Sequence, residues 1–85
     1  MTTGAHRHPR IITVDVTGRR ISAVFSDGRR ISVPLFWSWR LERATPSQRS
    51  RWELIGDGEG VRWPEIDEDL SARGFFEGKP APQRG

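Results

Sequence analysis

The chain has 85 residues, a formal net charge of +3, and neither cysteine nor tyrosine. A chain of this length forms one domain rather than two, and without cysteine no disulfide can support its small core. No apolar run approaches the ~18 residues of a membrane span, and residues 1–10 lack the apolar stretch of a secretory signal. The sequence therefore predicts a single cytoplasmic domain that does not enter a membrane.

The charges are distributed unevenly along the chain. Residues 1–51 carry ten arginines against three carboxylates, a balance of +7, whereas residues 52–85 carry four basic residues against eight carboxylates, a balance of −4. A basic half can steer a charged partner to one face of a domain. The two halves can equally neutralise each other within one fold or between the two copies of a homodimer, so both interpretations stay open.

Three segments in the first half are typical of β-strands. Residues 10–16, 20–26 and 29–33 are rich in β-branched side chains, and Asp27-Gly28 is typical of a hairpin turn. A two-residue turn would divide the apolar residues between the two faces of the sheet. A three-residue loop with Gly28 left-handed gathers them on one face, and burial of one face determines the register. We therefore predict that loop, with a buried face made of Ile21, Ala23, Phe25, Ile31 and Val33.

Two short helical segments are predicted after the third strand. Residues 35–43 are dense in aromatic side chains and suit a short helix or an irregular apolar segment. Thr45 then suits an N-cap, with proline at the first helical position and Gln48 placed to complete a capping box. Trp52 and Ile55 lie three residues apart and would share one apolar face. We therefore expect this helix to run to Ile55, where a glycine stops it.

The rest of the folded part is predicted to be a loop, a strand and an acidic segment. Residues 56–60 are rich in glycine, and residues 61–63 predict a short fourth strand ended by a proline. Residues 65–70 are acidic, and Ile66 and Leu70, four residues apart, predict a one-sided apolar anchor. The three carboxylates between them are placed as at the N-terminus of a helix.

The predicted fold class is α+β: a small antiparallel sheet of three strands plus a short fourth, packed against two short helices. One domain is expected over residues 10–77. Residues 1–9 and 78–85 are predicted to be a disordered leader and tail, because they carry no side chains large and apolar enough to offset the entropy of ordering.

A series of motifs runs through residues 33–74. They are Val33-Pro-Leu35, Arg40-Leu41, Ala44-Thr-Pro-x-Gln-Arg49, Trp52-x-Leu-Ile-Gly56, Gly58-x-Gly60 and Trp63-Pro-x-Ile-Asp-Glu-Asp-Leu70. Together with a Phe25-x-Asp-Gly28 hairpin they resemble a bacterial family catalogued as domain of unknown function 2442. The resemblance covers the chain from residue 10 to residue 78. It implies a small α+β domain and brings no established reaction, cofactor or catalytic residue. Because genes of the family often lie beside those of small toxins, it also implies an antitoxin-like or regulatory role, with a protein partner encoded by a neighbouring gene.

The residue types present argue against an enzyme. The two histidines, His6 and His8, lie in the predicted leader, where they cannot be held in place for proton transfer. Ser and Thr hydroxyls have no base near them, and cysteine is absent. Acid–base chemistry by Glu65, Asp67 or Asp69 stays a distant alternative. We therefore expect no catalytic residue and no cofactor.

The acidic half has the ligand type of a cation site but not its spacing. Carboxylate oxygens are the ligands that Ca²⁺ and Mg²⁺ prefer, yet their order here differs from that of an EF-hand loop. The glycine-rich loop among them carries acidic side chains and leads into a strand, so it does not suit phosphate either. We expect no metal site in this set, which is Asp57, Glu59, Glu65, Asp67, Glu68 and Asp69.

Trp39, Arg40 and Arg43 are the leading candidates for a binding surface. Their segment has more apolar side chains than one helix face can bury, so we expect Trp37 or Trp39 to be exposed. Trp beside Arg is the combination that protein-binding hot spots favour. The sequence thus favours a small non-catalytic binding or regulatory module with a protein partner.

A DNA- or RNA-binding regulator is the alternative. A helix beginning at Thr45 would present Gln48, Arg49 and Arg51, whose side chains suit base edges and phosphates. Against this, the helix is short and has to bury Trp52. Phosphate contacts give a steep dependence of affinity on salt, which would separate this alternative from protein binding.

Overall fold

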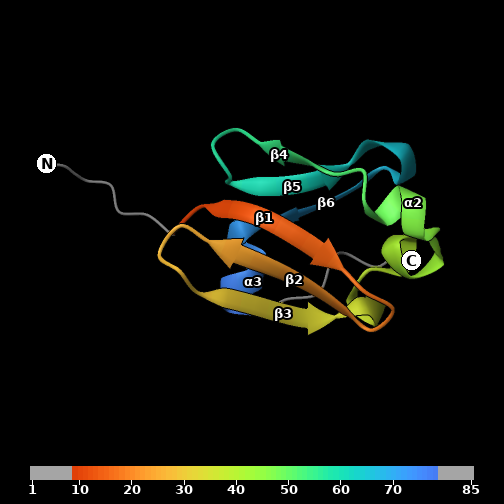
Figure 1. The fold of residues 1–85 in the computed structure, drawn as a ribbon, viewed down its shortest axis with the longest axis horizontal. Coiled ribbons are helices and arrows are strands. Elements are labelled where there is room, and N and C mark those ends of the chain that lie inside the picture. Colours follow the sequence, from red (N-terminus) through yellow and green to blue (C-terminus); the bar gives the residue numbers. More distant parts are fainter. Residues whose placement is uncertain (1–8, 79–85) are drawn as a thin grey trace, which may run out of the picture.

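Two small antiparallel sheets and several short helices make up the fold (Figure 1). The computed structural model describes residues 9–78, so His6, His8 and nearly all of the predicted leader and tail lie outside the described residues. The first sheet has the strand order β1-β2-β3 and the second β4-β5-β6, which makes the chain an α+β protein as predicted. In chain order the elements are β1 (Ile11–Val16), β2 (Arg20–Phe25), β3 (Arg30–Pro34), η1 (Leu35–Trp37), α1 (Trp39–Arg43), α2 (Pro46–Arg49), β4 (Glu53–Ile55), β5 (Gly60–Trp63), η2 (Pro64–Ile66), β6 (Glu68–Ser71) and α3 (Ala72–Glu77).

The first sheet has the predicted register. β2 pairs with β3 so that Ile21 lies opposite Val33 and Ala23 lies opposite Ile31. Ile21 and Ala23 are fully buried, and Val33 is nearly so. The prediction is confirmed because one residue of slip would have turned this whole apolar set toward solvent.

The hairpin of β2 and β3 closes at the pair Phe25 and Arg29, so its loop has the predicted three residues, 26–28. The Phe25 amide donates to the Arg29 carbonyl at 2.8 Å, and the Gly28 amide donates to the Phe25 carbonyl at 2.9 Å. Gly28 has a φ of +93°, a conformation that a residue with a Cβ rarely adopts. These two hydrogen bonds and the left-handed glycine together form the bulge that a three-residue hairpin loop requires.

Asp27 in this loop binds both the backbone and the side chain of Arg29. Its Oδ1 accepts from the Arg29 amide at 3.0 Å and its Oδ2 accepts from Arg29 Nε at 2.8 Å. The backbone hydrogen bond, assisted by the guanidinium, lowers the pKa of Asp27 below its usual 3.8.

A carboxylate whose folded pKa is lowered contributes stability that is complete above the unfolded pKa and is lost as the pH falls through the folded value. We therefore expect an NMR titration to place the Asp27 midpoint below 3.8, and Asp27→Asn to reduce acid destabilisation. A midpoint at or above 3.8 would contradict this.

The outer face of the same hairpin is polar. The Ser22 and Ser32 hydroxyl oxygens lie 2.6 Å apart across the two strands. Arg20 Nη2 donates to the Ser32 carbonyl at 3.1 Å. This face therefore carries hydrogen-bonding groups, whereas the opposite face carries the core.

The segment after β3 forms η1, α1 and α2, which is one helical element more than predicted. The predicted capping box is present: Thr45 Oγ1 accepts from the Gln48 amide at 3.1 Å, and Gln48 Oε1 accepts from the Thr45 amide at 2.9 Å. α2 nevertheless ends at Arg49. The prediction of a helix that runs to Ile55 is wrong.

Residues 53–55 form strand β4 instead. Leu54 lies opposite Val61 and Ile55 opposite Gly60, so the segment pairs along its length with β5. The spacing of Trp52 and Ile55 suits a helix, but it cannot supply the backbone pairing that a neighbouring strand offers. The predicted fourth strand is β5, and it lies in the middle of a second sheet rather than beside the first.

The acidic segment is a strand and not the N-terminus of a helix. Asp67 ends η2 with a left-handed φ of +56°, and β6 follows directly. β6 pairs with β5, with Glu68 opposite Trp63. The helix comes later, as α3, where Ser71 Oγ accepts from the Gly74 amide at 2.9 Å. No helix among residues 9–78 has the length and apolar content that crossing a membrane requires.

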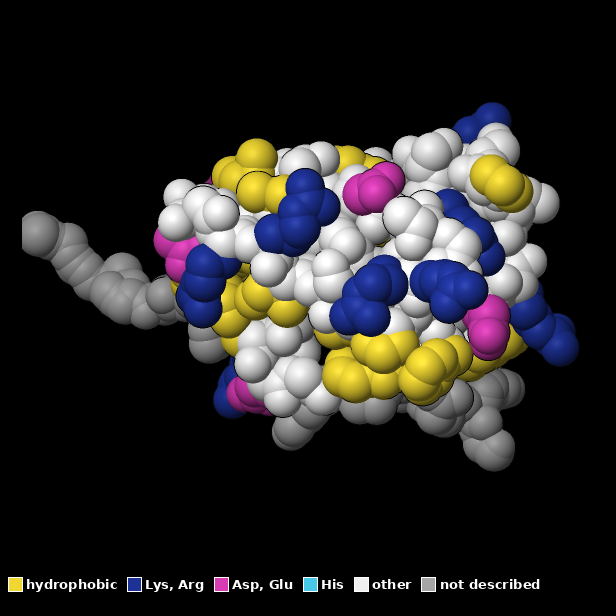
Figure 2. Space-filling model, turned by 60° about the horizontal axis from the view of Figure 1, so that its bottom comes forward, with side chains coloured by type: hydrophobic (Ala, Val, Ile, Leu, Met, Phe, Trp, Pro, Cys, Tyr) yellow, Lys and Arg dark blue, Asp and Glu magenta, His cyan; other side chains and the backbone are white. Residues whose placement is uncertain are grey.

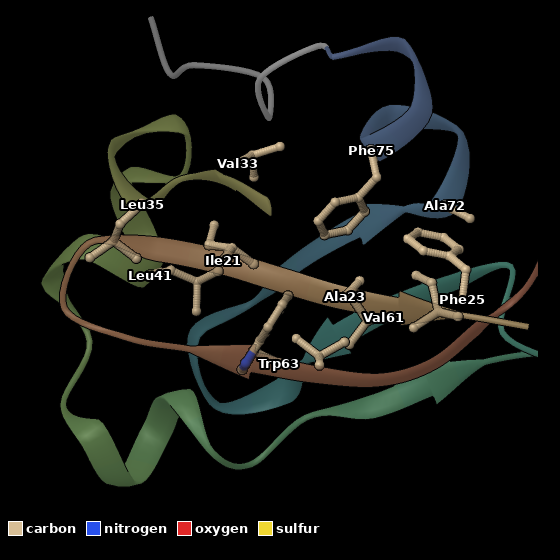
Figure 3. Packing of buried hydrophobic residues seen from close by; sticks show 12 residues of the cluster. Ile21, Ala23, Phe25, Val33, Leu35, Leu41, Val61, Trp63, Ala72 and Phe75 are labelled. Atoms are coloured by element: carbon tan, nitrogen blue, oxygen red, sulfur yellow. The ribbon is translucent and has the colours of Figure 1, made fainter. Parts of the chain in front are cut away.

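The core lies between the inner face of the first sheet, the second sheet and α3. Figure 3 shows side chains of β2 and β5 directed toward one another, with Phe75 reaching in from α3. The Phe25 and Phe75 rings meet edge to face, with centroids 5.9 Å apart. Phe25 is buried as predicted, and Trp63 is buried as well. Ile31 and Trp52, which were also predicted to be buried, are half-buried. The buried set is Ile11, Val14, Ile21, Ala23, Phe25, Val33, Leu35, Leu41, Val61, Trp63, Ala72 and Phe75.

The turn between β4 and β5 joins the second sheet to the first. The Ile11 amide donates to the Gly58 carbonyl at 2.8 Å, and the Ala72 amide donates to the Glu59 carbonyl at 2.8 Å. Gly58 is buried and has a φ of +99°. A Cβ at this position would lie 2.4 Å from the Ile11 carbonyl oxygen. Backbone atoms of the two sheets therefore approach more closely here than any side chain permits.

Candidate protein-binding surface

The predicted surface residues lie at one end of the first sheet, just beyond β3 (Figure 1). Arg20 pairs with Pro34, and the Leu35 amide donates to the Arg19 carbonyl at 2.8 Å. These contacts tie η1 to the turn between β1 and β2. The fold thus places Arg19 next to the start of η1, a juxtaposition that the sequence alone did not indicate.

Phe36 is the exposed aromatic side chain of this segment. It is 65% exposed, whereas its neighbour Leu35 is 5% exposed and belongs to the core. Trp37 and Trp39, one of which was expected to be exposed, are both half-buried. The tight turn of η1 sends consecutive side chains in different directions, and Leu35 takes the inward one. The sequence missed Phe36 because only the tertiary packing decides which aromatic side chain faces out.

Trp39, Arg40 and Arg43 come together as a cluster. The Arg40 guanidinium carbon lies 4.8 Å from the Trp39 ring centroid, and that of Arg43 lies 6.0 Å from it. Both distances are in the range of cation–π attraction, and Arg43 shares a helix face with Trp39 because four residues separate them. The Trp39 indole nitrogen is buried, so this side chain supports the surface as well as lining it.

A buried polar contact holds the start of α1 against the second sheet. Ser38 is fully buried, and its Oγ accepts from the Leu41 amide at 3.2 Å as the N-cap of α1. The same hydroxyl donates to Glu68 Oε2 at 2.5 Å, and Glu68 Oε1 accepts from the Asp69 amide at 3.0 Å. Glu68, one of the three carboxylates expected at a helix N-terminus, is 6% exposed. It links β6 to the segment that carries Phe36.

Replacing Ser38 by Ala removes both hydrogen bonds of this hydroxyl. We expect a loss of about 1–3 kcal/mol, because a buried carboxylate oxygen of Glu68 then lacks its donor. The measurement is urea unfolding followed by tryptophan fluorescence. Ser50→Ala is the matched control, since the Ser50 hydroxyl is on an exposed residue and contacts the Ser47 carbonyl. Equal stability losses in the two variants would contradict the assignment.

Among the described residues, no carboxylate pairs with the three arginines at this end of the first sheet. Arg19, Arg40 and Arg43 form no ion pair within residues 9–78, in contrast to Arg10, Arg29, Arg51, Arg62 and Arg73. We call the set Arg19, Phe36, Trp39, Arg40 and Arg43 the Arg–Phe surface. In the view of Figure 2, which brings β3 and η1 forward, apolar side chains gather in a band with basic side chains directly beside it.

The residues of the nucleic-acid alternative are engaged within the protein. Gln48 is held in the capping box. Arg49 donates from Nε to the Leu41 carbonyl at 2.9 Å and from Nη2 to the Glu42 carbonyl at 3.1 Å. Arg51 Nη1 lies 2.6 Å from Glu65 Oε2. Their binding to nucleic acid stays a prediction, but each side chain already has a structural partner.

The acidic residues are dispersed over the fold. Asp57 lies 3.8 Å from Arg10, Glu65 binds Arg51, and Glu68 is buried on Ser38. In the part of the chain that the structure describes, no three His, Cys, Asp or Glu side chains come close enough to share a metal ion.

The sequence of this fold matches a family model over residues 11–81, described as a protein of unknown function (DUF2442). The chain belongs to the DUF2442 family. The match includes both sheets and α3, so the Arg–Phe surface lies within the DUF2442 region.

A solved structure shares the DUF2442 fold seen here. The crystal structure of a protein of unknown function from Rhodospirillum rubrum ATCC 11170, at 2.75 Å resolution, superposes with a TM-score of 0.74. The two sequences are 26% identical, and the similarity covers 91% of this chain and 95% of that one. No curated protein matches the chain.

Proposed function

We propose that this protein is a non-catalytic binding module that contacts a protein partner through the Arg–Phe surface. The observation that carries the proposal is Phe36, an aromatic side chain 65% exposed in a domain that buries most of its large apolar residues. The cluster of Arg40, Arg43 and Trp39 on α1, the next element along the chain, supplies the residue types in which binding energy concentrates.

The surface is also held rigidly, which favours binding. Ser38 caps α1 and contacts Glu68 of the second sheet, while the Leu35 amide contacts the Arg19 carbonyl. A contact surface whose backbone is already ordered loses little entropy when a partner binds. The regulatory form of the proposal, with a small partner encoded by a neighbouring gene, takes its support from the family resemblance.

Replacing Phe36 by Ala tests the proposal. The untagged chain is coupled to a resin, partners are recovered from its own cells, and the affinity of the recovered protein is then measured by calorimetry. We expect Phe36→Ala to leave the circular dichroism spectrum and melting temperature unchanged, because the side chain is mostly in water. Affinity should fall by at least ~2 kcal/mol, about thirtyfold, because a central aromatic anchor is lost.

Ile12→Ala is the matched control for this experiment. Ile12 is 54% exposed and lies at the far end of the first sheet from η1, beside the irregularity at the start of β1. The substitution Ile12→Ala removes a similar exposed apolar side chain outside the Arg–Phe surface, so it should leave the affinity for the partner unchanged. If both variants bind as the wild type does, the contact lies elsewhere.

A further inference from the structure

We propose that the Arg–Phe surface recognises an acidic peptide segment with one apolar side chain among its carboxylates. This inference rests on the proposed function and adds the chemistry of the partner. It comes from the charges that the folded domain leaves uncompensated at one end.

The described arginines fall into two groups. Five form ion pairs within the fold, and Arg49 is bound to two backbone carbonyls. Arg19, Arg40, Arg43 and Arg30 have no such partner. Arg30 lies at the far end of β3, whereas Arg19 contacts the start of η1, which carries the exposed Phe36, and Arg40 and Arg43 belong to α1, which follows it. Arg20 is close by, and its hydrogen bond to a neutral carbonyl leaves its charge uncompensated as well. The end of the molecule at η1 therefore carries a concentrated positive charge around an apolar centre.

Carboxylates are the ligands that this arrangement suits. A guanidinium presents a planar fork of donors that binds a carboxylate through two parallel hydrogen bonds. Phe36 is on η1, between the turn that carries Arg19 and the helix that carries Arg40 and Arg43. An apolar side chain between two acidic residues would contact it while its neighbours reach the guanidinium groups. α1 also carries one carboxylate, Glu42. Its side chain is exposed and forms no ion pair with any described residue. It would repel a carboxylate placed over it and so restricts where the acidic residues can lie.

Nucleic acid fits the same surface less well. Bases bind protein by stacking on open aromatic faces, and here the Arg40 guanidinium already lies over the Trp39 ring. Phe36 would therefore be the one ring of this surface open for stacking, and the phosphate backbone has no apolar group that could cover the rest of it. α1 has only five residues, which is too short for a helix that reads a groove.

The experiment is an NMR titration of the isotopically labelled full chain with defined probes. The first probe is a short peptide of Glu and Asp with one central Leu. The second replaces every acid by its amide, the third replaces Leu by Ser, and the fourth is a DNA duplex of equal charge. We expect the first peptide to shift the NMR resonances of Arg19, Phe36, Arg40 and Arg43. The peptides without acids or without Leu should bind at least tenfold more weakly.

A charge-reversal variant locates the contact. The double variant R40E/R43E should lower the affinity for the first peptide at least tenfold. R30E is the control, because Arg30 lies at the opposite end of β3 and also lacks an ion pair among the described residues. It should change that affinity less than threefold. Equal binding of the amide peptide, tighter binding of the duplex, or equal effects of R40E/R43E and R30E would each overturn the inference. If a partner that depends on Phe36 is recovered from cells while the acidic peptide does not bind, the proposed function stands and the acidic chemistry is wrong.

Discussion

Trp63→Ala is expected to remove about 3–5 kcal/mol of stability, which is most of the free energy of unfolding of a domain this small. Trp63 is fully buried in β5, and its Nε1 donates to the Arg49 carbonyl at 2.9 Å. The substitution leaves a cavity between the two sheets and an unpaired carbonyl at the end of α2. Thermal unfolding followed by circular dichroism should show the melting temperature falling by at least roughly 12 °C.

Two further variants separate the contributions at this site. Trp63→Phe keeps much of the ring volume but loses the hydrogen bond to Arg49, so its loss should be smaller than that of Trp63→Ala. Trp52→Ala removes an indole that is only half-buried and should also cost less. A melting temperature that Trp63→Ala leaves unchanged would show that β5 does not lie at the centre of the core.

Gly58→Ala is expected to cost about 2–4 kcal/mol although it adds a single methyl group. At a φ of +99° an alanine is strained, and its Cβ would lie 2.4 Å from the Ile11 carbonyl oxygen and 2.9 Å from the Ile11 nitrogen. Both contacts are with backbone, so β1 or the turn has to move. The hydrogen bond from the Ile11 amide to the Gly58 carbonyl would then lengthen or break.

Gly18→Ala is the control for this prediction. No atom lies within 4 Å of a Cβ built at Gly18, and its φ is outside the left-handed range. Urea unfolding should therefore show a stability close to that of the wild type for Gly18→Ala and a lower midpoint for Gly58→Ala. Similar midpoints for the two variants would contradict the close approach of the sheets at Gly58.

The first sheet was predictable because its information is local. Two strands joined by Asp27-Gly28 have few alternative pairings, and burial of Ile21 and Val33 on one face selects among them. The capping box at Thr45 was predictable for the same reason, since Thr45 and Gln48 lie within one turn.

The second sheet was not predictable from local patterns. The spacing of Trp52 and Ile55 matches a helix, and Ile66 and Leu70 match one as well. Ile55 and Leu70 are instead in strands β4 and β6, which pair with β5, whereas Trp52 and Ile66 lie just before those strands. Pairing with a strand outweighs a helical pattern of two residues, because each paired residue gains backbone hydrogen bonds and cross-strand contacts.

The candidate site divides in the same way. Trp39, Arg40 and Arg43 are neighbours on one short helix, so their clustering followed from the sequence. The exposure of Phe36, the approach of Arg19 and the burial of Glu68 on Ser38 depend on contacts between distant segments. A serine and a glutamate thirty residues apart carry no sequence signal that they will meet.

The arginine on β2 that contacts the Ser32 carbonyl also decides how the first sheet ends. Residues 29 and 35 bond inward to β2, so by alternation the backbone groups of 30, 32 and 34 point away from the sheet. The Ser32 carbonyl is occupied by Arg20, and Pro34 has no amide hydrogen to donate. An incoming strand would find two of its bonding sites missing next to the Arg–Phe surface. This part of the edge is thus less able to accept an added strand or to pair edge to edge, which favours recognition by side chains.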